Sequence, residues 1–167
     1  MVRLAIRDKD KVLITMNLFP TVDDSMIFRQ LGLGPKVPAY CTAVGKALLF
    51  PLPPDQRKDF LKQVNLSRHT PKTMVQEEAL LAELDEAARQ GFSRECEEYM
   101  KGLSCIGAPI FDDSLQAVAA ISISGSVDLL SRPDLPQLAE DLVYTAGEIS
   151  MSLGCPASYL MRGMKNR

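Results

Sequence analysis

The segments Gly102-Leu-Ser-Cys-Ile-Gly-Ala-Pro-Ile-Phe111 and Ala119-Ala-Ile-Ser-Ile-Ser-Gly125 decide the fold, because each is an apolar run of strand length that carries isolated polar side chains. These polar side chains are the thiol of Cys105 and the hydroxyls of Ser122 and Ser124. A buried polar group without a hydrogen-bond partner costs about 1 to 3 kcal/mol. The three side chains therefore indicate either satisfied polar groups in a core or the lining of a ligand pocket.

The turn-forming residues Asp112–Leu115 predict a hairpin between the two segments. A loop of these four residues pairs Phe111 with Gln116, Cys105 with Ser122, and Leu103 with Ser124. Side chains alternate along a strand, so the polar residues then share one face of the hairpin and the other face is apolar. The apolar face consists of Ile106, Ala108, Ile110, Ala117, Ala119, Ile121 and Ile123.

The polar side of this hairpin is predicted to be recessed, because Gly107 and Ala120 on the same side are small. A recess lined by polar groups suits a ligand. Serines that bond to neighbouring backbone, with Cys105 packed as a small hydrophobe, would give the same pattern. The residues alone leave both interpretations open.

Composition excludes several classes of protein. The chain has 167 residues, 46% of them hydrophobic, and its net charge of −2 comes from 19 basic and 21 acidic residues without a basic stripe, so this segment is not expected to hold DNA itself. No apolar stretch approaches the roughly 20 residues of a membrane span, so we expect a cytoplasmic protein. The four cysteines form no Cys-x-x-Cys pair and are expected to be reduced: Cys41, Cys96, Cys105 and Cys155.

Strand and helix patterns alternate irregularly, which favours an α+β fold with an antiparallel sheet. Strands are predicted at residues 2–7, 11–18, 25–31, 103–111 and 117–124. Helices are predicted at residues 43–50, with Thr42 as the cap, and at 55–64, 76–90 and 136–153. The chain opens directly on a strand, so we expect the C-terminal part of a longer protein, with one domain over residues 1–156 and a solvated C-terminal tail over 157–167.

Four strings of the sequence carry a resemblance to a known family. They are Pro38-Ala-Tyr-Cys-Thr-Ala-Val-Gly-Lys-Ala-Leu-Leu49, Glu97-Glu98 followed by the first opening segment, the second opening segment, and Ile149-Ser-Met-Ser-Leu-Gly154. In this order and spacing they resemble the C-terminal effector-binding domain of the IclR family of bacterial transcriptional regulators.

The resemblance implies a GAF-like domain, an antiparallel β-sheet flanked by α-helices, that binds a small-molecule effector and modulates operator binding. DNA would be bound only through an N-terminal winged helix-turn-helix domain that this chain lacks. The resemblance also implies a homodimer or homotetramer and no catalysis. No cofactor or membrane partner is expected. A metal site of Cys105 and Glu95 with Cys41 or Cys96 is conceivable, but none is predicted because the spacing matches no zinc signature.

The resemblance further implies which residues bind the effector. The backbone N–H groups of Ala43 and Val44 would start the Thr-x-x-Gly-Lys helix, where unpaired amides and the helix dipole attract anions. The other pocket positions correspond to Glu95, Leu103, Cys105, Ser122 and Ser124. A small carboxylate, such as an oxo-acid or a sugar acid, fits these groups.

This sequence departs from the family pattern at several positions. Glu95 replaces the usual aspartate, so its role in the pocket is open, and Tyr40 and Cys41 replace the histidine and small residue common before the helix. Arg29 stands where an apolar residue is common, and it is either a further ligand-binding residue with a bidentate carboxylate contact or a solvated strand arginine.

An alternative function is a GAF-like redox enzyme of the free methionine sulfoxide reductase type that uses Cys105, with Cys96 on a facing edge of the pocket. A redox thiol needs exposure and a lowered pKa. The neighbouring Glu95, Glu97 and Glu98 would raise the energy of a thiolate, which disfavours this alternative.

Overall fold

The computed structural model describes residues 1–21 and 35–164, and the side chains of these up to residue 160. The strands are β1 (Val2–Asp8), β2 (Lys11–Leu18), β3 (Lys36–Pro38), β4 (Ser93–Cys96), β5 (Leu103–Phe111) and β6 (Ala117–Ser126). The helices are α2 (Ala43–Leu49), α3 (Pro54–Gln63), α4 (Glu77–Gln90), the short 3-10 helix η1 (Val127–Ser131), α5 (Leu135–Ser152) and α6 (Ala157–Met164).

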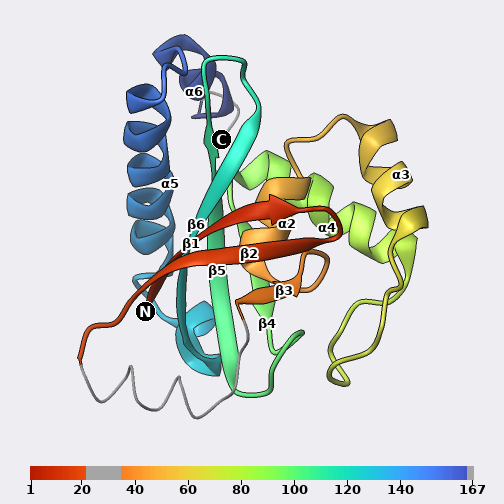
Figure 1. Ribbon diagram of the computed structural model, residues 1–167. Helices are drawn as coiled ribbons and strands as arrows, with labels where there is room; N and C mark the ends of the chain where they lie inside the picture. Colours follow the sequence, from red (N-terminus) through yellow and green to blue (C-terminus); the bar gives the residue numbers. More distant parts are fainter. Residues whose placement is uncertain (22–34, 165–167) are drawn as a thin grey trace.

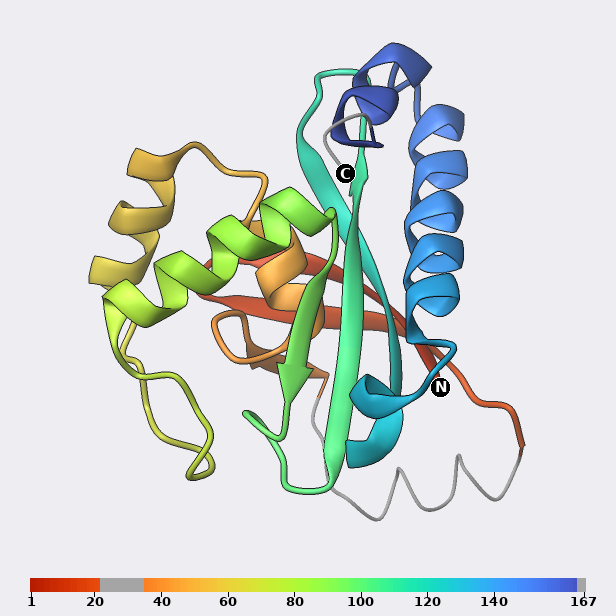
Figure 2. The same cartoon turned by 180° about the vertical axis from the view of Figure 1, so that it is seen from behind.

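One antiparallel six-stranded sheet, in the order β3-β2-β1-β6-β5-β4, forms the centre of the fold. Figures 1 and 2 show α5 along one face of this sheet, and α2 with α4 on the other. The α5 side packs Leu142 and Ala146 against Ile106 and Ile110 of β5. This arrangement confirms the predicted α+β class and the antiparallel sheet flanked by helices.

The α2 side of the sheet has its own apolar core. Val44 and Ala47 of α2 pack there with Ala5 of β1 and Ala120 of β6. Two glycines allow this close packing, because a Cβ on Gly107 would lie 2.7 Å from the carbonyl oxygen of Ala43, and a Cβ on Gly45 would lie 2.2 Å from that of Ala39. The start of α2 is therefore pressed directly onto β5.

The register of the β5–β6 hairpin differs from the prediction by two residues. The loop is Asp113–Leu115, closed by the hydrogen bond from Asp112 N–H to the carbonyl of Gln116, with Leu115 in the left-handed region at φ 62°. One more residue is inserted beyond the loop, where Ile110 pairs with Ala119 but Phe111 pairs with Ala117. The register therefore has Cys105 opposite Ser124, Gly107 opposite Ser122, and Leu103 opposite Ser126.

A shift of two residues keeps every side chain beyond the bulge on its predicted face, because the strand period is two. Ile106, Ala108, Ile110 and Ile121 accordingly belong to the core on the α5 side, with Ala119 and Ile123 packed against it. Ala117 is the exception, since it lies on the loop side of the bulge and packs with the core on the α2 side.

Most predicted elements within the described residues are present, with some differences. Sequence analysis missed β3, β4 and η1, and the predicted strand at residues 25–31 lies outside the described residues. Residues 157–164, assigned to a C-terminal tail, form α6. Thr42 occupies the N-cap position of α2 but does not cap it, because its hydroxyl donates to the carbonyl of Pro38 at 2.8 Å.

Candidate functional site

Four strands bring five polar residues together on the α2 side of the sheet, a group called here the polar face: Arg3, Glu95, Cys105, Ser122 and Ser124. The pairing of neighbouring strands sets Arg3 opposite Ser122, Glu95 opposite Cys105, and Cys105 opposite Ser124. All five side chains are buried, with 2% to 6% of each residue exposed. These three pairings therefore form one buried polar patch beside the start of α2.

Cys105 and Ser124 are directly hydrogen bonded. The Cys105 thiol donates to the Ser124 hydroxyl oxygen at 3.1 Å. Burial, and then the neighbouring Glu95 carboxylate, raise the pKa of the Cys105 thiol far above its ordinary value. Cys105 is therefore a neutral, inert thiol at physiological pH.

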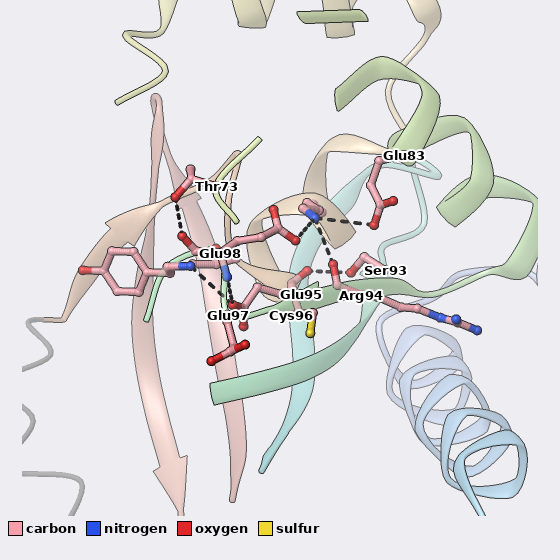
Figure 3. A network of polar contacts seen from close by, with 12 residues as sticks. Thr73, Glu83, Ser93, Arg94, Glu95, Cys96, Glu97 and Glu98 are labelled. Carbon is pink, nitrogen blue, oxygen red and sulfur yellow. Dashed lines mark hydrogen bonds and ion pairs between the residues drawn. The ribbon is translucent and has the colours of Figure 1, made fainter. Parts of the chain in front are cut away.

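Glu95 is buried on the polar face, so the glutamate that replaces the usual aspartate does point inward. Its Oε1 atom accepts from the backbone N–H of Glu98 at 2.8 Å and from that of Tyr99 at 3.3 Å (Figure 3). Burial raises the pKa of this carboxyl group, although the two N–H donors and the Cys105 thiol act in the opposite direction. The Oε1 atom of Glu95 thus binds the backbone of the β4–β5 turn at the border of the polar face.

The start of α2 adds backbone donors beside this face. Within the described residues, the N–H groups of Ala43 and Val44 have no hydrogen-bond acceptor, and the first helical bond of α2 runs from Lys46 N–H to the carbonyl of Thr42 at 2.9 Å. Ser93 anchors this end of the helix, because its hydroxyl donates to the carbonyl of Ala43 at 2.7 Å.

A buried ionic network fixes α2 to the β4–β5 turn. The Lys46 ammonium is fully buried and donates to Glu98 at 2.6 Å and to the carbonyl of Arg94 at 3.0 Å, with Glu83 at 3.5 Å (Figure 3). The carbonyl of Glu98 accepts from Thr73 at 2.6 Å. These contacts have a supporting role, since they satisfy buried charges rather than line the polar face.

Glu97 and Glu98 have different roles in the turn that follows β4. Glu97 accepts the N–H of Gly102 at 2.8 Å. Gly102 has φ +78°, a conformation that favours glycine, and Glu97 itself has φ 55°. Glu97, whose backbone is in the left-handed region, therefore contacts Gly102 through its side chain, whereas the side chain of Glu98 points to Lys46.

The predicted facing pair of cysteines is wrong. Side chains alternate along β4, so Cys96 lies on the opposite side of the strand from Glu95 and the polar face. Its sulfur accepts from the hydroxyl of Ser104 at 3.6 Å. Cys96 and Cys105 are thus not arranged as a redox pair.

The remaining predicted site residues have different outcomes. Leu103 is half-buried at the end of β5 opposite Ser126, on the same side of the sheet as Cys105. Arg29 lies outside the described residues. Two cavities, of about 710 and 690 Å³, lie elsewhere: one beside Arg7 and Phe60, and one between β5 and α5 with α6.

Arg3 is the polar-face residue that sequence analysis missed. Arg3 was assigned only to the predicted strand at residues 2–7, although Ala5 two residues later belongs to a buried core. Residues two apart on a strand share a face, so an arginine in phase with a buried alanine indicates a buried charge. Once Ala5 is assigned to the core, the spacing of two residues predicts that Arg3 is buried.

Solved structures share this fold. The C-terminal domain of the E. coli transcriptional regulator KdgR matches with a TM-score of 0.78 and 33% identity over 92% of this chain and 87% of that one. The Thermotoga maritima IclR structure matches with a TM-score of 0.78 and 32% identity, over 92% of this chain and 61% of the other. The fold is therefore that of the C-terminal domains of such regulators.

The family follows from the sequence as well. The family model described as "Bacterial transcriptional regulator IclR C-terminal" matches residues 1–151, and this chain belongs to that family. The HTH-type transcriptional repressor AllR of Klebsiella pneumoniae is 39% identical over 130 residues, and that of Escherichia coli K12 is 37% identical over 133. These alignments cover 78% and 80% of this chain but 48% and 49% of the repressors, so the chain spans about half the length of these relatives. In the described part of the chain, no helix is both long and apolar enough to cross a membrane.

Proposed function

We propose that this domain senses a small carboxylate metabolite, an oxo-acid or a sugar acid, and that binding changes how the full-length regulator engages its operator DNA. The DNA contact belongs to an N-terminal winged helix-turn-helix domain, and the working form is a homodimer or homotetramer in the cytoplasm. The supporting observation is the convergence of Cys105, Ser122 and Ser124 beside the N–H groups of Ala43 and Val44, which have no acceptor among the residues that the structure describes.

The proposed contacts follow from the chemistry of these groups. The N–H groups of Ala43 and Val44 donate to a carboxylate, because unpaired amides at a helix start carry partial positive charge. The hydroxyls of Ser122 and Ser124 donate to the carboxylate or accept from a ligand hydroxyl. Leu103, Cys105 and Glu95 form the wall, and Arg29 remains a further proposed contact.

The domain is proposed to bind rather than to catalyse. The Cys105 thiol is protonated and buried, and Cys96 lies on the other side of β4, so the reductase alternative lacks its nucleophile and its second thiol. An assay for reduction of free methionine sulfoxide is expected to give no turnover above that of a Cys105→Ser variant.

Calorimetry with the 167-residue chain tests the binding proposal. We expect pyruvate, 2-oxobutyrate or gluconate to bind the wild type, and Ser122→Ala and Cys105→Val to weaken that binding at least fivefold, because both side chains face the ligand. Ser126→Ala is the matched control, since Ser126 lies on the same side of β6 but is exposed. Absence of binding to every acid, or equal binding by all variants, would contradict the proposal.

A further inference from the structure

Residues 67–73, called here the strap, form an irregular segment between α3 and α4 that is tied to two other parts of the fold. Two threonines of the strap are buried although it contains no helix or strand, with 7% of Thr70 and 3% of Thr73 exposed. Buried hydroxyl groups require hydrogen-bond partners. The contacts of these two residues therefore show where the strap is held.

One tie joins the strap to the β4–β5 turn. The Thr70 hydroxyl donates to the carbonyl of Glu97 at 2.6 Å. The Thr73 hydroxyl donates to the carbonyl of Glu98, also at 2.6 Å (Figure 3). The Thr73 hydroxyl oxygen accepts the N–H of His69 at 3.0 Å and that of Thr70 at 2.8 Å. A single threonine thus orders the strap and fastens it to the turn.

The β4–β5 turn is strained at the point where the strap holds it. Glu97 has φ 55°, in the left-handed region, where a residue other than glycine persists only when surrounding contacts hold it. Its carboxylate pairs with the Lys72 ammonium of the strap, and its carbonyl accepts from Thr70. The strap therefore contacts both the side chain and the main chain of the strained residue.

The other tie joins the strap to Tyr40, which precedes α2. Tyr40 is buried, and its hydroxyl donates to the carbonyl of Ser67 at 2.6 Å. Because that hydroxyl carries a single proton, it accepts from the Nε2–H group of His69 at 3.0 Å. The His69 ring also contacts the Tyr99 ring edge to face, with centroids 5.1 Å apart. One histidine of the strap thus contacts both Tyr40 and the β4–β5 turn.

Movement of the β4–β5 turn reaches the polar face through Glu98 and Tyr99. The N–H groups of both residues donate to Oε1 of Glu95, which lies opposite Cys105. All polar-face residues are buried, so a small molecule reaches them only when a neighbouring part of the chain moves. The turn is such a part, because its backbone holds Glu95 and the strap holds its backbone.

We propose that the strap controls access to the polar face: its release from Tyr40 and from the β4–β5 turn lets the turn move and exposes Cys105, while the sheet and α5 stay folded. The strap and the turn then open as one cooperative unit, because each tie requires an ordered strap. The strain at Glu97 favours opening once the strap contacts are lost. This opening is independent of which ligand, or whether any, binds at the polar face.

Native-state hydrogen exchange of the 167-residue chain tests whether the strap and the turn open together. The N–H groups of Thr70, Glu98 and Tyr99 are hydrogen bonded in the strap or the turn. They are expected to exchange through one shared opening, with an equilibrium constant about tenfold or more above that of Ile106 and Ile110 in β5. Separate openings for Thr70 and for Glu98 with Tyr99 would overturn the proposal. Exchange of all five N–H groups only by global unfolding would also overturn it.

Two variants release one tie each. Tyr40→Phe removes the hydroxyl that donates to Ser67, and Thr73→Val removes the hydroxyl that donates to Glu98. Each variant is expected to speed labelling of Cys105 by iodoacetamide about tenfold, the factor for one lost hydrogen bond of a buried group. Tyr40→Phe should also speed exchange at the Glu98 N–H about tenfold, although the substitution lies at the other tie.

Thr145→Val is the matched control, because the exposed Thr145 hydroxyl donates to a backbone carbonyl of α5 at 2.7 Å. It should change Cys105 labelling by less than about twofold. Unchanged Glu98 exchange in Tyr40→Phe, or unchanged Cys105 labelling in either strap variant, would contradict the proposal. So would labelling that rises only in proportion to the loss of global stability in urea. The wild-type exchange experiment needs no substitution, so it decides the matter if a variant does not fold.

Discussion

Glu95 shows at the residue scale how burial decides what a carboxyl group does. It is nearly inaccessible, with 2% of its surface exposed, and is held by the N–H groups of Glu98 and Tyr99. The family resemblance gave it as a pocket position but left its orientation open, because one extra methylene relative to aspartate can point a carboxyl group either way. The backbone donors that turn it inward arise from the β4–β5 turn, which local sequence did not predict.

The pH dependence of stability should report on Glu95. Its pKa in the folded protein is raised above the ordinary value of 4.5, so the stabilisation linked to its protonation is present below that value and is lost as the pH rises through the raised pKa. The Glu95→Gln variant has no carboxyl group at this position, so it does not lose this stabilisation as the pH rises. The melting temperature of Glu95→Gln minus that of the wild type should therefore increase between pH 4.5 and pH 8, measured by circular dichroism.

One other buried group contributes to this comparison. Glu98 also has a pKa raised by burial, and its charge in turn raises the pKa of Glu95, so the difference reports Glu95 together with its coupling to Glu98. A difference in melting temperature that stays constant or falls with increasing pH would show that the pKa of Glu95 is not raised in the folded state.

Cys105 and Cys96 should differ in reactivity in the native protein. Cys105 is buried and its thiol pKa is raised, whereas Cys96 is half-buried. Because only the thiolate reacts, iodoacetamide at pH 8 should label Cys96 first and leave Cys105 unmodified until the chain unfolds. Peptide mass spectrometry over a time course measures the order, and early labelling of Cys105 would restore the redox alternative.

At the scale of elements, α2 and the β4–β5 turn are joined by the Lys46–Glu98 pair. The pair is buried, and the second carboxylate oxygen of Glu98 has no hydrogen-bond partner in the described part of the chain, so Lys46 is its main source of compensation there. This network connects α2 to the β4–β5 turn beside the polar face. Strand β5 contributes Gly107, which lets the start of the helix lie close to the strand.

Removing Lys46 should be costly. Lys46→Met leaves the Glu98 carboxylate buried without its cation and is expected to lower the free energy of unfolding by about 3 to 5 kcal/mol. The double variant Lys46→Met with Glu98→Leu should recover part of this loss, because no buried charge remains. Urea unfolding measures both, and a single-variant loss below about 1 kcal/mol would show that the pair is not strongly coupled.

The β5–β6 hairpin shows that sequence predicts the face of each side chain more readily than the register of the strands. Period-two alternation correctly assigned faces to Cys105, Ser122 and Ser124, because any even shift preserves them. The register itself depends on the left-handed Leu115 and on one inserted residue beyond the loop, and leucine carries no signal for that conformation. Strand β4 was missed because Ser-Arg-Glu-Cys is short and polar, although its first and third residues are buried.

At the scale of the whole molecule, the sheet separates two environments. Helix α5 lies on one side of the sheet and α2 on the other (Figure 1). The α5 side has an apolar core, and the α2 side has an apolar core that adjoins the polar face. The sequence predicted an antiparallel sheet, helices α2 to α5, and Cys105, Ser122 and Ser124 on one face, and the family resemblance added Glu95. Arg3 was missed because its burial is set by β1 lying beside β6, a contact between segments more than a hundred residues apart.

The two cavities compete with the polar face as ligand sites. The 690 Å³ cavity is large enough for a metabolite, and its walls include Gly91, Tyr144 and Leu160. Its lining is mostly apolar side chains, which suits a carboxylate less well than backbone N–H groups and hydroxyls do. A map of where a ligand binds therefore discriminates between the sites without any substitution.

The most direct test of the account is a titration of the isotope-labelled 167-residue chain with pyruvate, 2-oxobutyrate and gluconate, followed by amide chemical shifts. The account predicts that the largest shifts for at least one acid fall on the N–H groups of Ala43 and Val44 and on those of Cys105, Ser122 and Ser124. Largest shifts around Gly91, Tyr144 and Leu160, or no shifts with any of the three acids, would contradict it.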